Sequence, residues 1–537
     1  MRVTKTLFNK IWLETAVLVI LAVSTCFGFA SDTLVIGLAE PVETFDPGNY
    51  RDRTTETVLR NMFDGLVTRT PDGQVVLEIA ESAQMIDEKT MEFVIKQGIL
   101  FHNGDRLTAD DVKFSFDRII GENGIDYPEP HTSPRKSLIA PLNNVEVIDE
   151  HRVRFHFESP WPVVMQMLVH QKILPGKYFK LVGNEGFGKA PVGCGPFKFV
   201  EVAKDGQIVM SRFDGYYGGS DAIPPVGPAA FKKLVFQVIP GSQERIWAVQ
   251  TGKVQIIQEV PIQLVGLLEV TPYINVKTGP GTTPVWMEMN VNRFPFDDLR
   301  VRRAINMGVD PARLNRDILN SRGVVLTGPL SPFNDFYDPL VTGDEPSLER
   351  AAELLCESGW TRSKENGLLE KDGNTLSFTL DMRAAHSELG NEVARQLGLL
   401  GCGVEVEVWD DVTAMKKSLL NGEREAYIGN WGDSAFDPIG FIEAKCHTFS
   451  KDSSYGRGNY SGYSNAQVDQ LIRAGEVESN FEVRQEIYSQ IQRILLNEVP
   501  AVFLVLPQAI EASSIVVQNW RVSADGRLNM HDVWLSW

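Results

Sequence analysis

Hydrophobic and polar positions along the chain follow two different periods. Thr33–Leu38 and Ala501–Leu506 are short apolar runs, which are typical of buried strands, and Arg152–Phe157 alternates with a period of two, as a half-buried strand does. Thr54–Leu66 and Leu348–Glu357 instead repeat apolar residues at helical spacing. Strands and helices succeed one another in this way through most of the chain. We therefore predict an α/β protein with parallel or mixed sheets.

The most distinctive segment is Phe101–Arg118, with the sequence FHNGDRLTADDVKFSFDR. Asn103-Gly104 predicts a tight turn, because both residues tolerate a positive φ. Thr108 is placed to cap a helix, and Asp110 and Asp111 stand in the first turn, where the helix dipole favours anions. The segment therefore predicts a turn followed by a capped helix with one buried face.

The length and charge of the chain limit its organisation and its partners. A chain of 537 residues is too long for one ordinary core, so we expect two or three domains. The sequence contains no repeat of fixed period and no long linker, which favours domains built from discontiguous segments. The net charge of −18 argues against nucleic acid as a partner, because such a protein has little to displace counterions from phosphate.

The first thirty residues have the pattern of an export signal. Arg2, Lys5 and Lys10 precede the apolar stretch Thr15–Phe27, and Gly28-Phe29-Ala30 offers the small residues that signal peptidases prefer. The apolar stretch is shorter than the roughly 20 residues that a spanning helix needs. We expect residues 1–30 to be a signal peptide and the mature protein to be periplasmic.

The cysteines give two further expectations. Lipidation at Cys26 is the less favoured mode of processing, because the preceding Val23-Ser24-Thr25 matches such a signal poorly. The four remaining cysteines are Cys194, Cys356, Cys402 and Cys446. An oxidising compartment permits one or two disulfides among them, and four buried free thiols are an equally good interpretation.

Patterns of catalytic and metal-binding residues are missing. The sequence has no G-x-S-x-G elbow, no H-E-x-x-H, no phosphate-binding loop and no dinucleotide fingerprint. The eight histidines stand singly, and the paired acids Asp110-Asp111 and Asp297-Asp298 fall at helix starts, where capping explains them. We therefore expect no enzymatic activity, no metal and no cofactor.

Several blocks of the sequence resemble one known family. These blocks are Phe101–Arg118, Pro191–Phe197, Phe296–Asn306 and Tyr463-Ser464-Asn465. In sequence and in order, they are similar to signatures of the family 5 extracytoplasmic solute-binding proteins, which serve peptide, nickel and opine importers. Cys194 departs from the threonine that is usual at its place. The resemblance extends over essentially the whole mature chain.

The resemblance implies a type II periplasmic binding protein of the large class, with two lobes that close on a ligand about a hinge and an extra small domain on the first lobe. The hinge crossings are expected near Pro191, Trp286 and Ala501. The expected ranges are residues 31–75, 195–285 and 505–537 for lobe I, 76–194 for the small domain and 286–504 for lobe II.

The resemblance also implies a function and its partners. We expect a monomer that captures a small solute, either a short peptide or a peptide-like or opine-like compound, and delivers it to an inner-membrane ABC permease. Two alternatives of other classes stay open, namely an exported hydrolase and a periplasmic sensor or chaperone that uses the same fold.

The loop Trp431–Asp437 is the first candidate for ligand contact, because it follows the predicted strand Tyr427–Asn430 and loops after strands face the crevice of α/β proteins. Peptide-binding members of the family pair an aspartate in this loop with the α-amino group of the peptide. Ser434 occupies that position here, and Asp433 lies one residue earlier. Either Asp433 takes the role, or the ligand has no free amine.

Five further residues are candidates for contact with the ligand. Arg383 follows a predicted strand and is a candidate partner for a carboxylate or phosphate, with a solvated arginine as the alternative. Trp286 and Trp431 are candidates for stacking on the ligand, and a role in the core is an equal alternative for each. Glu43 and Phe45 follow the first strand, where the family lines its cleft.

Overall fold

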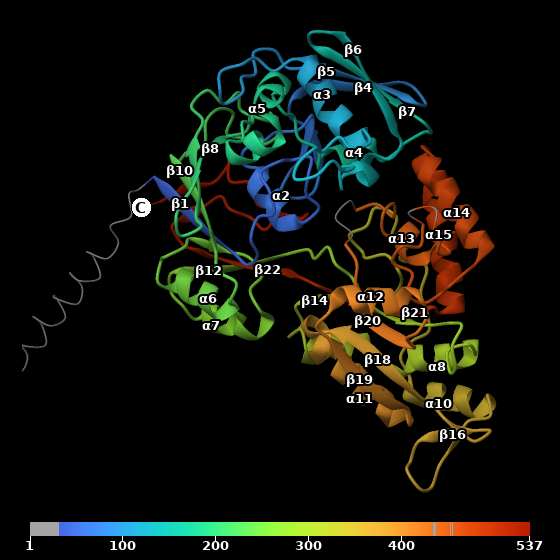
Figure 1. Cartoon of the computed structure of the whole chain (residues 1–537). Coiled ribbons are helices and arrows are strands. Elements are labelled where there is room, and N and C mark those ends of the chain that lie inside the picture. The colour runs from blue at the N-terminus through green and yellow to red at the C-terminus, as the bar shows by residue number, and fades with distance from the viewer. Residues whose placement is uncertain (1–31, 433–435, 452, 454, 537) are drawn as a thin grey trace, which may run out of the picture.

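The computed structural model describes residues 32–432, 436–451, 453 and 455–536. Within these residues, two large mixed sheets and a smaller antiparallel sheet carry most of the helices. Figure 1 shows the first large sheet and the small sheet on one side of the molecule, which we call lobe I, and the second large sheet on the other side, which we call lobe II. The predicted α/β class with mixed sheets is confirmed.

The sheet of lobe I is buried on both faces. In order, its described strands are β12 (Ile274–Gly279), β22 (Ala509–Ser514), β11 (Ile256–Ile257), β1 (Thr33–Leu38), β10 (Lys233–Val238), β9 (Ile208–Arg212) and β8 (Phe197–Val202). Leu34 and Ile36 of β1 pack into one hydrophobic cluster and Val35 into another, on the opposite face. Burial on both faces explains why β1 is a continuous apolar run.

Helices cover the two faces of this sheet. Residues of α2 (Arg53–Leu59) and α5 (Gly176–Lys189) pack on the face that Leu34 contacts, and residues of α6 (Ser242–Gln250) and α7 (Val265–Glu269) pack on the other. The first residue of α2, Arg53, donates a hydrogen bond to the hydroxyl of Thr282, which lies in the segment between β12 and the sheet of lobe II. The start of α2 is therefore at the boundary between the lobes.

The sheet of lobe II also has a core on each face. In order, its described strands are β14 (Gly323–Val325), β21 (Ala501–Pro507), β13 (Val285–Met289), β20 (Ala426–Asn430), β18 (Ser377–Arg383) and β19 (Gly403–Trp409). Met287 of β13 packs into the cluster on one face, whereas the adjacent Trp286 packs into the cluster on the other. This alternation is what the period of two in a strand requires.

Two groups of helices flank the lobe II sheet. The cluster with Met287 includes residues of α8 (Leu299–Gly308), α9 (Pro311–Asp317), α10 (Leu348–Glu357) and α11 (Ser387–Leu400). The cluster with Trp286 includes residues of α13 (Ile442–Cys446), α14 (Ala466–Val477) and α15 (Phe481–Glu498). α12 (Val412–Leu420) packs in a smaller cluster with Tyr427 and Tyr460.

The small antiparallel sheet of lobe I carries the segment that the sequence singled out. Its described strands, in order, are β4 (Ala80–Asp87), β5 (Thr90–Ile95), β7 (Arg152–Phe157) and β6 (Leu142–Asp149). The helix α3 (Ala109–Ile120) packs on it, with Phe116 4.7 Å from Phe155 between ring centroids. Thr108 and Asp111 form a capping box, and Gly104 has a φ of +89°, so the predicted cap and turn are confirmed.

Shorter elements complete the described chain. They are α4 (Val164–Leu168), β2 (Val67–Arg69), β3 (Val75–Leu77), β15 (Thr361–Arg362), β16 (Leu369–Lys371), β17 (Asn374–Thr375), β23 (Val517–Gln518), β24 (Trp534–Leu535) and the 3-10 helices Lys136–Ile139, Ile262–Leu264 and Ala384–His386. None of the described helices has the length and apolar character that crossing a membrane requires.

The described chain passes between the two large sheets at residues 280–284, which join β12 to β13, and at Gln508, which joins β21 to β22. The crossing expected near Pro191 is wrong, because residues 190–196 lead from α5 into β8 of lobe I. A Cβ at Gly193 or Gly195 would lie within 2.6 Å of the Met62 backbone, so close packing explains these glycines. The expected domain ranges stay a prediction.

The four cysteines of the described region are free thiols. Cys194, Cys402 and Cys446 are buried, and burial raises the pKa of Cys402 to about 12. Cys356 is exposed on α10, so the interpretation of four buried thiols is wrong for this residue. The alternative of one or two disulfides among the four is likewise not what the structure contains.

Candidate functional site

Residues of both lobes line one cavity of about 1000 Å³. Lobe I contributes the segment around α2, most of residues 135–141, residues 158–161, Met167, His170 and Arg527. Lobe II contributes residues 431–432 and 439–440 before α13, Glu443 of α13, Tyr455, Arg457 and part of α14. A volume of this size is at the upper end of what small-molecule sites usually have, and such sites are common between domains. We take this cavity as the candidate site.

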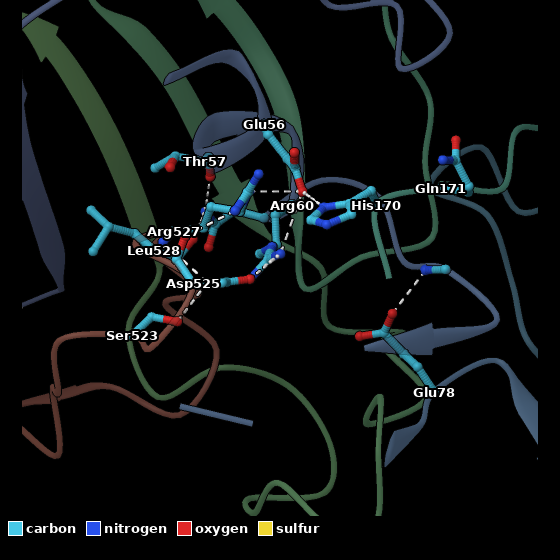
Figure 2. A network of polar contacts seen from close by, with 12 residues as sticks. Glu56, Thr57, Arg60, Glu78, His170, Gln171, Ser523, Asp525, Arg527 and Leu528 are labelled. Carbon is cyan, nitrogen blue, oxygen red and sulfur yellow. Dashed lines mark hydrogen bonds and ion pairs between the residues drawn. The ribbon is translucent and has the colours of Figure 1, made fainter. Parts of the chain in front are cut away.

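Glu56 is the centre of the cavity wall in lobe I. Its Oε1 lies 2.8 Å from Nδ1 of His170 and 3.0 Å from Nε of Arg527 (Figure 2). Burial alone would raise the pKa of Glu56, but Arg527 and His170 hold this pKa well below its usual range. Burial lowers the pKa of His170 to about 4, so at neutral pH the ring is uncharged and Nδ1–H donates to the carboxylate.

A second buried carboxylate supports this wall from behind. Asp525 accepts hydrogen bonds from Nη2 of Arg60 at 2.9 Å and from the Ser523 hydroxyl at 2.7 Å, as Figure 2 shows. Burial acts against the charged form, but Arg60 and Arg527 lower the pKa of Asp525 below its usual value. The C-terminal segment is thereby tied to α2, although the two are more than 450 residues apart in sequence.

The wall in lobe II is a loop that begins where β20 ends. The half-buried Trp431 donates from Nε1 to the Gly440 carbonyl at 3.0 Å. A Cβ at Gly458 would lie 2.5 Å from the Trp431 ring, so only glycine fits beneath it. Asp437 forms a two-pronged ion pair with Arg484 of α15, with N···O distances of 2.5 and 2.7 Å. These contacts fix the described parts of the loop, residues 431–432 and 436–440, against lobe II.

A buried lysine holds α13 to the sheet. Lys445 pairs with Glu288 of β13 and donates to the Gly458 carbonyl at 2.8 Å. Its ammonium lies 5.9 Å from the ring centroid of Trp286 and 5.6 Å from that of Trp431. The amine is therefore fully engaged inside lobe II, and its role is to position the wall.

Two glutamates of lobe II line the cavity side by side. Glu443 of α13 pairs with Arg457, and Glu476 of α14 accepts a hydrogen bond of 2.6 Å from the Tyr455 hydroxyl. Burial and the neighbouring Glu443 raise the pKa of Glu476 to about 7. Near neutral pH, Glu476 is therefore partly protonated, which reduces the negative charge of these two glutamates.

The residues expected to contact the ligand are placed as follows. Trp431 lines the cavity, whereas Asp433 and Ser434 lie outside the described residues. Trp286 is 4% exposed and packs against Phe503 and Phe441 in the core of lobe II, away from the cavity lining.

The other three expected residues do not line the cavity either. Arg383 is exposed at the end of β18. Phe45 is half-buried against Phe199, with 5.1 Å between ring centroids, and Glu43 is exposed, with its pKa raised by partial burial and by the nearby Asp52. Their roles in ligand contact stay predictions.

Sequence reasoning missed most of the charged lining. The six arginines of the described lining are Arg51, Arg53, Arg135, Arg457, Arg473 and Arg527. They come from segments far apart in the chain, and none stands in a recognisable motif. The one local signal is Arg51-Asp52-Arg53, a charged group directly before an apolar helix.

A family comparison confirms the resemblance found in the sequence. The family model described as "Bacterial extracellular solute-binding proteins, family 5 Middle" matches residues 74–453, which is more than half of the chain. The protein belongs to this family. It is a solute-binding protein with the two-lobed fold, and the family is one of binding proteins rather than enzymes.

Relatives and solved structures agree with this assignment along nearly the whole chain. The chain is 26% identical over 495 residues to the oligopeptide-binding protein AppA of Bacillus subtilis, covering 89% of this chain and 86% of AppA. The structure of AppA in complex with a nonapeptide has a TM-score of 0.72 at 23% identity and covers 94% of this chain and 99% of AppA. NikA from Brucella suis in complex with Fe(III)-EDTA has a TM-score of 0.80 at 20% identity, with coverage of 94% and 100%.

Proposed function

We propose that this solute-binding protein is the extracytoplasmic component of an ABC importer and captures a short peptide or a peptide-like or opine-like compound. It hands this solute to an inner-membrane permease. The names of the relatives support the proposal, since AppA is an oligopeptide-binding protein whose solved structure contains a nonapeptide.

The observation that carries the proposal is the cavity lined from both lobes. A solute held there contacts Trp431 on one side and the segment around α2 on the other, so its binding favours a closed arrangement of the lobes. Closure gives the permease a shape that depends on the ligand. A Kd of about 1 μM, or about −8 kcal/mol, suffices for a receptor that must also release its cargo.

The location and assembly of the protein belong to the same proposal. Residues 1–30 act as a signal peptide that is cleaved after Ala30, and the mature chain works in the periplasm as a monomer that binds no nucleic acid. Residues 31–75, 195–285 and 505–537 form lobe I, residues 76–194 the small domain and residues 286–504 lobe II. The short crossings at residues 280–284 and at Gln508 support the division into two lobes, although β21 keeps residues 505–507 in the sheet of lobe II.

In this proposal, Trp431 stacks on the ligand, and Asp433, which lies outside the described residues, anchors an amine if the ligand has one. The position of Trp431 on the cavity wall supports the first of these roles. Five more residues stay in the hypothesis as part of the ligand path, with substitution to alanine as the test: Ser434, Arg383, Trp286, Phe45 and Glu43.

Isothermal titration calorimetry with di- to pentapeptides tests the proposal. We expect one site per chain, with a Kd in the micromolar range for at least one peptide and a weakening of about tenfold in Trp431→Ala. Trp534→Ala is the matched control, because Trp534 is exposed on β24 and lies outside the cavity lining. Equal affinity in both variants would refute the role of Trp431, and binding of no peptide would refute the peptide class.

A further inference from the structure

The cavity has an excess of positive charge among its described residues. Six arginines and four glutamates line it. Glu56 is paired with Arg527, and Glu443 is paired with Arg457. Glu476 is bonded to a tyrosine hydroxyl rather than to an arginine, and the exposed Glu158 forms no ion pair with an arginine of the described chain. The pairs account for two of the arginines, and the others need a separate explanation.

Three of the remaining arginines come from lobe I, and their hydrogen bonds go to neutral atoms. Arg51 donates to the Pro134 carbonyl and the Ser137 hydroxyl, both at 3.0 Å. Arg53 donates to the Thr282 hydroxyl at 2.9 Å, within a segment that joins the lobes. Arg135 donates to the backbone carbonyl of His170 and to the side-chain carbonyl of Gln171. Within the described chain, no carboxylate forms an ion pair with any of the three.

Arg473 of lobe II likewise has no ion-pair partner among the described carboxylates. Its Nη1 lies 2.8 Å from Nε2 of His447. The charge of Arg473 also acts on the nearby Glu476, although the two form no ion pair. Arg473 and Arg51 are both exposed side chains, and Arg53 is half-buried, so a solute in the cavity can reach these three. Arg135 is only 1% exposed and contributes its charge from behind the wall.

The arginines also repel one another across the boundary between the lobes. Partial removal from water inside the cavity, followed by the charges of Arg135 in lobe I and Arg457 in lobe II, lowers the pKa of Arg51 to about 10. Within lobe I, burial and the charge of Arg527 lower the pKa of Arg53, although nearby carboxylates such as Asp525 act in the opposite direction. An anion between the walls relieves this repulsion and draws the lobes together, whereas a neutral or cationic solute does not.

We propose that the solute carries at least two negative charges, on carboxylates or on phosphate, which Arg51 and Arg53 of lobe I and Arg473 of lobe II hold between the lobes. This inference rests on the proposed function, because it names the class of solute that the same cavity takes. The planar guanidinium forks suit both carboxylate and phosphate oxygens, so the arginines alone do not separate the two sources.

Calorimetry with matched probes tests the inference. The peptide probes are Glu-Glu, Ala-Ala and Lys-Lys, and the non-peptide probes are citrate and glucose 6-phosphate. We expect Glu-Glu to bind at least about tenfold more tightly than Ala-Ala, with an affinity that falls as salt is added. We expect Arg51→Gln with Arg53→Gln to remove this preference, and Arg51→Lys with Arg53→Lys to retain a large part of it.

Arg350→Gln is the matched control, because Arg350 is an exposed arginine of α10 that pairs with Glu353 outside the cavity. Thermal unfolding shows whether each variant is folded, and the lysine variant keeps the test valid if the glutamine variant is not. Tighter binding of citrate than of glucose 6-phosphate assigns the arginines to carboxylates, and the reverse order assigns them to phosphate.

The outcomes separate the inference from the proposed function. If Ala-Ala or Lys-Lys binds as tightly as Glu-Glu, the peptide function stands and the inference is overturned. If only citrate or glucose 6-phosphate binds, and Arg51→Gln with Arg53→Gln abolishes this binding, the inference stands and the peptide function fails. If no anionic probe binds, the inference is overturned as well.

Discussion

Asp437 and Arg484 form a buried ion pair behind the ligand cavity, and we expect Asp437→Asn to break it at a large cost in stability. The two side chains are 3% and 4% exposed and meet through two N···O contacts of 2.5 and 2.7 Å. Arg484 also donates to the Gly475 carbonyl at 2.7 Å and lies over the Phe336 ring at 4.5 Å. The arginine therefore has no route to solvent when its partner loses its charge.

The expected loss of stability follows from the state in which the substitution leaves Arg484. Asparagine has nearly the shape of aspartate, so the packing is kept while the buried arginine loses the carboxylate that it pairs with. The charge of Asp335, which acts on Arg484 without forming an ion pair, is what remains nearby. Removing one partner of a buried pair costs about 3–5 kcal/mol. The exposed pair of Arg350 and Glu353 on α10, each side chain 53% exposed, is the comparison, and Glu353→Gln should change stability by less than about 1 kcal/mol.

Urea unfolding followed by circular dichroism measures both variants. We expect a lower midpoint for Asp437→Asn at an unchanged slope, and a weaker affinity for any solute, because Ile439, Gly440 and Glu443 next to this pair line the cavity. A free energy of unfolding within about 1 kcal/mol of the wild type would refute the reasoning, because losing the partner of a buried cation would then cost no more than losing that of an exposed one.

Three further outcomes are expected. Burial raises the pKa of Glu511 from 4.5 to about 7, so the folded state keeps a proton that the unfolded chain releases, and stability falls as pH rises between these values. Glu511→Gln should therefore match the wild type in urea unfolding at pH 4 and exceed it by up to about 3 kcal/mol at pH 8. Thr108→Ala should cost about 1 kcal/mol in the same assay, while Thr108→Ser costs little, because the capping box of α3 is lost only in the first. Iodoacetamide should alkylate Cys356 of the native protein, and the buried Cys194, Cys402 and Cys446 only after unfolding, as peptide mass spectrometry can check.

The regular elements were the most predictable part of the fold. Thr33–Leu38 and Leu348–Glu357 coincide with β1 and α10, because a doubly buried strand and an amphipathic helix with a serine cap have strong local patterns. The helix predicted over Thr54–Leu66 ends at Leu59 instead. Its continuation is replaced by long-range bonds, in which the Asn61 side chain donates to the Leu528 carbonyl and accepts from the Met530 amide. Periodicity contains no information about such a partner.

The candidate site was predictable only where it follows a strand. Trp431 was found because it comes directly after β20, at the edge of a sheet where ligands bind. Arg53, Arg135 and Arg527 meet at the cavity through tertiary folding alone. Arg383 also follows a strand, yet it is exposed outside the lining, because the end of β18 does not reach the cavity. A position at the end of a strand is therefore a useful but incomplete signal.

Native mass spectrometry tests the central claim that one solute is held between the lobes. The mature protein is weighed as purified without denaturation, and again after incubation with Glu-Glu, citrate and glucose 6-phosphate. We predict one solute per chain in at least one of these samples, and its loss in the variant with Arg51→Gln and Arg53→Gln. The bare mass of the polypeptide in every sample, or a bound solute that the variant retains in full, would contradict the account.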